Sequence, residues 1–261
     1  MRPTALFAAI AELRFPQLLL VSAAAWAVML LSAHGVIMPA LCTAADGSWL
    51  TRSSHGIAAA FALSPPTAQI VPWLVMLLAM MPPLLTQPVA HLWDRSFARR
   101  RWRAIGLFVA GYGAIWTLAG MGLMATAIVV SELCRQVALP AVLPAAALAL
   151  LWQSSPAKQI CLNRCHHLPR LSAFGLAADV DSLRYGIISA IWCAGACWAL
   201  MLIPLIVDGM HLLVMAAVSA LLLTERLAEA RPAHWRWPFA ILPGGSPVST
   251  LAQPASNTPS S

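Results

Sequence analysis

The chain has 261 residues, of which 60% are hydrophobic and only 10% are charged, and its mean hydropathy is +0.77. A soluble globular domain has about 25% charged residues, so this composition excludes a soluble protein and is that of an integral membrane protein. The formal net charge of +7 raises nucleic-acid binding as an alternative, which the positions of the basic residues argue against.

Six apolar runs approach the roughly 20 residues that are needed to cross the hydrocarbon core of a bilayer. In chain order they cover residues 16–37, 70–91, 104–130, 136–152, 184–207 and 210–224. The sequence therefore predicts an all-α fold, a polytopic transmembrane helix bundle with about six spans. Pro82 and Pro83 predict a break in the second span, because proline removes backbone hydrogen bonds.

The basic residues fix the expected orientation of the bundle. If the N-terminus is cytoplasmic and six spans alternate, fourteen of the sixteen Lys and Arg residues lie on the cytoplasmic side, and only Arg52 and Arg135 lie outside. This distribution matches the excess of positive charge found in cytoplasmic loops. We therefore expect both termini in the cytoplasm, and we interpret the basic run at residues 95–103 as an orientation signal.

The chain is expected to form one membrane domain over residues 1–231. It includes a Gly/Ser/Thr/Pro-rich outer loop at residues 38–69 and an inner loop at residues 153–183. From Pro232 onward the composition turns to Pro, Ser and Gly, which predicts a disordered tail over residues 232–261. No cleavable signal peptide is evident, because the first apolar run is too long. A bacterial inner membrane is the expected location, with the protein crossing it several times.

Sulfur-containing side chains recur at helical spacing in the fifth predicted span. Cys193, Cys197 and Met201 are separated by four residues each, so they lie within an arc of about 80° on one helix face. Thiolate and thioether groups select soft metals, copper(I) first. The alternative is that these residues only pack in the bundle, since Cys and Met are common as buried apolar residues.

A second cluster lies in the predicted inner loop, where Cys161 and Cys165 are followed by His166 and His167. The C-x3-C spacing suits copper(I), or zinc at Cys161 and Cys165, if the segment forms a helical turn. Reduced thiols without a ligand role are the alternative.

Thioether and imidazole groups elsewhere complete the candidate metal site. Met76, Met80 and Met81 precede the double proline, and Met80 is the candidate ligand. Met210 and His211 follow Asp208 at the outer end of the fifth and sixth spans. From the outer mouth to the cytosolic exit, the candidates form a line that could pass copper inward: Met210, His211, Met201, Cys197, Cys193, Cys161, Cys165 and His166.

Other polar and aromatic residues are expected to have structural roles only. Tyr112, flanked by Gly111 and Gly113, is expected to serve helix packing. Glu225 is expected to pair with an arginine, and Asp179 is expected to be solvated.

Six segments, in order, resemble the signatures of the family known as domain of unknown function 2182, over about residues 70–226. They are WLVMLLAMMP (73–82), GYGAIW (111–116), SPAKQICLNRC (155–165), WCAGACWALM (192–201), GMHLLVMA (209–216) and TER (224–226). The resemblance implies a metal-binding integral membrane protein, and some members of that family are described as copper chaperones. The chain departs from the family at residues 166–168, where His166, His167 and Leu168 replace the usual Arg-Ser, and at Ala196, where a further Cys is frequent.

The sequence predicts a membrane protein that handles copper(I) as a chaperone or transport component. Its expected partners are the lipid bilayer and a cuproenzyme or another metal-handling protein, with no nucleic acid. Two alternatives remain, a non-catalytic assembly subunit of a membrane complex and a membrane thiol oxidoreductase. We expect no enzyme, because the nucleotide-binding, hydrolase and metalloprotease motifs are missing.

Overall fold

A computed structural model describes residues 16–33, 70–172, 174–207, 210–228 and 232–235. Within these residues all regular secondary structure is helical, which confirms the predicted all-α class. The helices are α2 (Pro16–Ala33), α6 (Ile70–Met80), the 3₁₀ helix η2 (Pro82–Leu85), α7 (Thr86–Arg95), α8 (Arg101–Gln136), α9 (Val142–Ser154), α10 (Pro156–Cys165), α11 (Gly175–Ile206) and α12 (His211–Leu227). The predicted outer loop at 38–69 and nearly all of the predicted tail lie outside the described residues.

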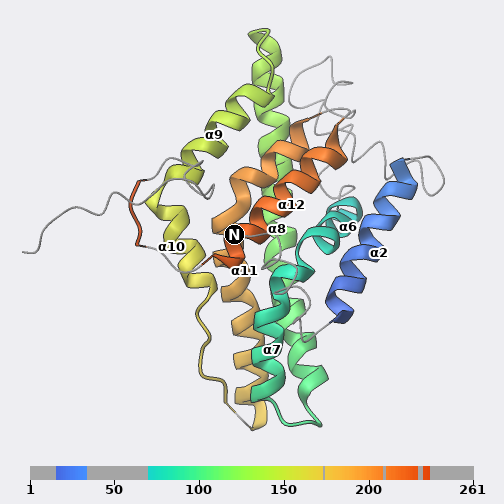
Figure 1. Ribbon diagram of the computed structural model, residues 1–261, viewed down its shortest axis with the longest axis vertical. Coiled ribbons are helices and arrows are strands. Elements are labelled where there is room, and N and C mark those ends of the chain that lie inside the picture. The colour runs from blue at the N-terminus through green and yellow to red at the C-terminus, as the bar shows by residue number, and fades with distance from the viewer. Residues whose placement is uncertain (1–15, 34–69, 173, 208–209, 229–231, 236–261) are drawn as a thin grey trace, which may run out of the picture.

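Helices α8 and α11 form the centre of the bundle, and the other helices pack around them (Figure 1). Glycine allows their backbones to meet. A Cβ atom at Gly186 would lie 2.2 Å from the carbonyl oxygen of Phe108, and one at Gly111 would lie 2.7 Å from that of Leu183. Small residues at such a crossing let two long apolar helices approach closely. This contact fixes the position of α11 relative to α8.

The double proline breaks the second predicted span, as expected. Helix α6 ends at Met80, and the chain turns by 58° through η2 into α7. Pro83 has no N–H group to donate to the carbonyl oxygen of Ala79, four residues earlier. The Ser22 hydroxyl of α2 donates a hydrogen bond to that oxygen instead. A side chain from a neighbouring helix therefore satisfies the carbonyl that the proline leaves open.

Most of the predicted fourth span and the first part of the predicted inner loop form two helices, α9 and α10, which both pack on α11. Ser155 separates them in an extended conformation, with φ −75° and ψ 145°, as expected of a residue that precedes proline. Its hydroxyl oxygen accepts a hydrogen bond from the Lys158 N–H and caps α10. Figure 1 shows α10 continuing from α9 on the same side of the bundle.

The described helices include three candidate membrane spans, or four, which is fewer than the six that the sequence predicts. Helices α2, α8 and α11 are long and apolar enough to cross a membrane, and α6 with α7 forms a fourth, bent candidate. Helix α9 has 13 residues and α12 has 17. At 1.5 Å per residue they are roughly 20 and 26 Å long, shorter than the roughly 30 Å hydrocarbon core.

Charged side chains connect α8 and α11 at the basic end of the bundle. Asp179 lies 2.6 Å from an Arg100 nitrogen and 2.7 Å from an Arg103 nitrogen, and its side chain is only 14% exposed. The expectation that Asp179 is solvated was therefore wrong. The carboxylate instead holds the start of α11 against the start of α8, because both arginines lie at the start of α8.

Candidate metal centre

Tyr112 brings sulfur atoms from two different helices together. It lies on α8, which is packed against α11, and its hydroxyl oxygen is 3.3 Å from Cys193 Sγ and 3.6 Å from Met81 Sδ. The hydroxyl can donate to either sulfur, and Tyr112 is only 4% exposed. Met81 is the residue between α6 and η2, so the proline break places a thioether beside the thiol of α11.

Cys197 lies one turn further along α11 and is more deeply buried. It is 2% exposed, and its thiol donates to the carbonyl oxygen of Cys193 at 2.9 Å. Such a bond to the preceding turn of the same helix is typical of small polar side chains in apolar surroundings. Met201, another turn along, has no exposed surface. The expected sulfur face of α11 is therefore present, and Cys193 is its least buried member.

Helix α10 packs on α11 and contacts it at Gly195, which lies about 200° around the helix from Cys193. Cys161 occupies the space left by the missing side chain of Gly195, where a Cβ atom would lie 2.8 Å from Cys161 Sγ. Gly195 stands between Cys193 and Cys197 in the sequence. Its carbonyl oxygen accepts a hydrogen bond of 3.0 Å from the Trp152 indole of α9. We call Cys161, Cys165, Cys193 and Cys197 the thiol cluster, because all four stand on the packed helices α10 and α11.

Burial keeps the α10 thiols protonated. It raises the pKa of Cys161 above its ordinary value and that of Cys165 to about 12. At Cys165 the neighbouring Cys193 raises the pKa further, while the Arg226 guanidinium lowers it. Metal ligation requires thiolates, so a metal that binds here must displace protons.

The two predicted histidine ligands contact backbone oxygens. His166 has Nδ1 3.0 Å from the carbonyl oxygen of Leu162 and Nε2 3.0 Å from that of Arg226, so both ring nitrogens face backbone oxygens. His211 Nδ1 lies 2.8 Å from the carbonyl oxygen of Pro204 and caps the last turn of α11.

Two predicted methionines also differ from the expected arrangement. Met210 is 58% exposed at the start of α12, whereas Met80 is 4% exposed, and the adjacent Met81 makes the sulfur contact with Tyr112. In this structure the predicted line of ligands is divided between α11, which carries Cys193, Cys197 and Met201, and α10, which carries Cys161 and Cys165. Cys161 lies level with Gly195 rather than below Cys193, because α10 is a helix packed on α11.

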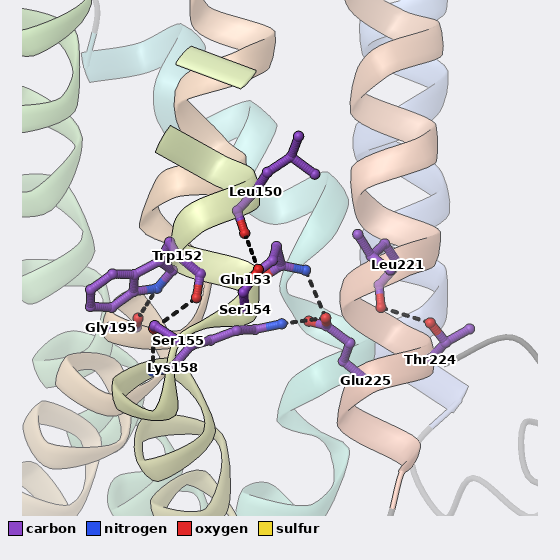
Figure 2. A network of polar contacts seen from close by, with 10 residues as sticks. All are labelled: Leu150, Trp152, Gln153, Ser154, Ser155, Lys158, Gly195, Leu221, Thr224 and Glu225. Carbon is purple, nitrogen blue, oxygen red and sulfur yellow. Dashed lines mark hydrogen bonds and ion pairs between the residues drawn. The ribbon is translucent and has the colours of Figure 1, made fainter. Parts of the chain in front are cut away.

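A buried polar network next to the thiol cluster was not predicted (Figure 2). Lys158 of α10 forms an ion pair with Glu225 of α12, and their side chains are only 7% and 3% exposed. Gln153 of α9 donates to the same carboxylate at 2.8 Å. The expected arginine partner of Glu225 was wrong, because Arg226 instead donates to the carbonyl oxygen of Cys165. Lys158 precedes Cys161 by one helical turn, and this lysine beside the predicted ligands is the sequence signal that could have suggested the network.

The described residues contain no group of three or more His, Cys, Asp or Glu side chains arranged to hold a metal ion. A tetrahedral zinc site is built from four such ligands. Copper(I) is satisfied by two thiolates and accepts a thioether as well. The thiol and thioether beside the Tyr112 hydroxyl are ligand types that soft metals prefer.

Comparison with protein families also indicates a role with copper. The model of a family described as PpoB2, copper chaperone, matches residues 70–244. The chain belongs to this copper chaperone family. The matched region contains all four residues of the thiol cluster together with Tyr112, Lys158 and Glu225. No curated protein and no solved structure matches the chain. The copper chaperone family thus agrees with the role that the resemblance in the sequence implied, although under a different family name.

Proposed function

We propose that this member of the copper chaperone family is an integral membrane protein that binds copper(I) at the thiol cluster and passes it to a cuproenzyme or another metal-handling protein. The observation that carries the proposal is that Tyr112 holds Cys193 beside Met81, while Cys165 of the packed helix α10 interacts electrostatically with Cys193. Two thiolates from opposite helices would hold the cargo, and Met81 would add a thioether.

The three or four apolar helices support a location in a membrane, and the basic-residue distribution favours the inner membrane of a bacterium with both termini inside. A thiol oxidoreductase is less well supported. Cys193 and Cys197 are one turn apart on a regular helix, which is poor geometry for a disulfide, and the Cys197 thiol bonds to its own helix.

The test is the copper(I) content of the purified protein in detergent. We expect the unaltered chain to bind copper(I), and C193S/C197S and C161S/C165S each to lose it, because each pair removes the ligands of one helix. The matched control is C134S, which changes a buried cysteine in the last turns of α8, outside the thiol cluster. Copper binding that survives in both double variants would overturn the proposed site. No copper in the unaltered chain would instead favour an assembly subunit.

A further inference from the structure

A cavity of about 310 Å³ is lined by residues of α11, of the end of α10 and of the segment that follows α10. Figure 1 shows that segment running along α11 toward the start of the helix. The charged residues of the lining are Arg164, Arg170, Arg184 and Asp181, so its formal charge is +2. The volume is that of a small-molecule site, and the excess of positive charge indicates an anionic ligand.

The wall of the cavity around Arg170 is held by contacts with two helices. Nε2 of His91 on α7 lies 2.9 Å from the carbonyl oxygen of Pro169. On the other side, the Ser172 N–H donates to the Asp181 carboxylate of α11 at 2.9 Å. The backbone is therefore fixed both before and after Arg170, which gives the cavity a defined wall.

The three arginines of the cavity have donor groups to offer to a ligand. Among the residues that the structure describes, no ion pair involves any of them, although Arg184 interacts electrostatically with Asp181. The guanidinium carbon of Arg164 lies 5.5 Å from the centroid of the Trp192 ring, and such a contact leaves N–H groups at the edge of the guanidinium available. Guanidinium groups bind phosphate through paired N–H donors, and the several oxygens of phosphate can accept from more than one arginine.

Apolar residues of α11 complete the lining. Ile188 and Trp192 belong to the cavity, and Ile188 is 39% exposed. Ile191, further along α11, is 48% exposed. Residues 185–206 contain no charged side chain, and at 1.5 Å per residue they extend about 33 Å, close to the thickness of the hydrocarbon core. In the proposed membrane location, Arg184 therefore lies at the level of the lipid headgroups, and Ile188 and Ile191 face the lipid chains.

We propose that this cavity binds the phosphate group of one anionic phospholipid, whose acyl chains lie along Ile188 and Ile191. This inference rests on the membrane location in the proposed function, and it does not depend on copper binding. A lipid fits the cavity better than a soluble phosphate compound, because phosphate-binding arginines and an exposed apolar residue line the same cavity. A lipid bound to arginines of both elements would hold the segment after α10 against α11.

The test measures lipid binding to the delipidated full-length protein in detergent by native mass spectrometry. With dioleoyl phosphatidylglycerol as the probe, we expect one tightly bound molecule. Dioleoyl phosphatidylcholine, whose headgroup has no net charge, should bind more weakly. In R170Q/R184Q the affinity for phosphatidylglycerol should fall by about thirtyfold, because each arginine near an anionic lipid contributes roughly fivefold.

The matched control is R95Q/R99Q. It removes two charges from exposed arginines of the basic run, outside the cavity, and should leave the affinity unchanged. Equal losses in the two double variants would show a general attraction of the basic run to anionic lipid and would overturn the site. Equal affinity of the unaltered protein for the two lipids would overturn the role of the arginines. If R170Q/R184Q does not fold, R170Q and R184Q carry the test singly, each with an expected loss of about fivefold.

A soluble phosphate compound is the competing ligand, and glycerol 3-phosphate represents it. In large excess it should leave phosphatidylglycerol bound, because it lacks the acyl chains. Displacement of the lipid would overturn the lipid as the ligand of this cavity. Absence of the chain from the membrane fraction of cells would overturn the proposed membrane location. A chain that is found in the membrane but does not select phosphatidylglycerol would overturn this inference alone.

Discussion

Tyr112 shows how a residue with an ordinary sequence context acquires a specific place in the site. Its neighbours Gly111 and Gly113 predicted helix packing, and Gly111 does pack against α11. The same close approach carries the Tyr112 hydroxyl to Cys193, and the proline break carries Met81 to the hydroxyl. Neither contact leaves a mark in the sequence, because each depends on the crossing of helices that are far apart along the chain.

Removal of the Tyr112 hydroxyl tests this contact. In Y112F we expect copper(I) affinity to fall by about fivefold, since the lost hydrogen bond to Cys193 contributes roughly 1 kcal/mol net. The fold should be retained, because the aromatic ring stays in place. Competition against a copper(I) chelator measures the affinity. The control is Y185F, which alters the only other tyrosine, packed against His91 and Phe108. Equal effects of the two substitutions would contradict a role for Tyr112 in the thiol cluster.

The pH behaviour of Cys165 follows from its burial. Its pKa is raised from the ordinary 9.0 to about 12, so at pH 8 the folded protein holds roughly a thousandfold less thiolate there than the unfolded chain. We expect alkylation of Cys165 at pH 8 to be far slower in the folded protein than in denaturant, as measured by peptide mass spectrometry.

The same shift gives a direction for stability. The folded state keeps the Cys165 proton where the unfolded state loses it, so this contribution is fully present below about pH 9 and is lost as pH rises toward about 12. The free energy of unfolding should therefore fall over that window. Equal alkylation rates in folded and denatured protein would show that the thiol is not buried.

At the scale of the helices, the sequence predicted the long apolar elements well and the shorter ones poorly. Helices α8 and α11 contain the predicted third and fifth spans, and the break after α6 follows from Pro82 and Pro83. The region around Ser155 was misjudged. Hydrophobicity falls there, which predicted a loop, yet the Ser155 cap and Pro156 start a new helix. Lys158 of α10 is buried against Glu225 of α12, a contact that local hydrophobicity does not report.

The seat of Cys161 gives a prediction for the packing of α10 on α11. In G195A the new methyl group would lie 2.8 Å from Cys161 Sγ, so we expect α10 to shift and copper(I) affinity to fall by about tenfold or more, although every cysteine remains. Copper titration measures the effect. The matched control is G122A on α8, where a Cβ atom meets nothing within 4 Å and alanine should even stabilise the helix. Unchanged binding in G195A would contradict the close contact.

For the whole molecule, the starts of α8 and α11 define one end of the helix bundle. Arg100 reaches both Gly175 and Asp179, so the starts of the two longest helices lie at the same end. That end also carries the basic run at residues 95–103. We therefore expect it to face the cytoplasm.

Single-cysteine labelling tests this orientation. A cysteine introduced at Arg99 or Phe174 should react with a membrane-impermeant reagent only from the cytoplasmic side, and one introduced at Leu139 only from the outer side. The cysteines of the chain would be replaced by serine for this purpose. Labelling of positions 99 and 139 from the same side would contradict a membrane-crossing α8. The number of remaining crossings does not affect the result.

The break at Ser155 also has a mechanical consequence for the way a ligand can be exchanged. Helix α11 has 32 residues and packs backbone to backbone against α8. Helix α10 has only ten residues, and it lies between the extended Ser155 and a non-helical segment that begins at His166. A displacement that changes the sulfur-to-sulfur distances between the two helices should therefore need less energy in α10 than in α11. Because Cys161 and Cys165 lie on the same short helix, they would move together relative to Cys193 and Cys197, which stay fixed on α11.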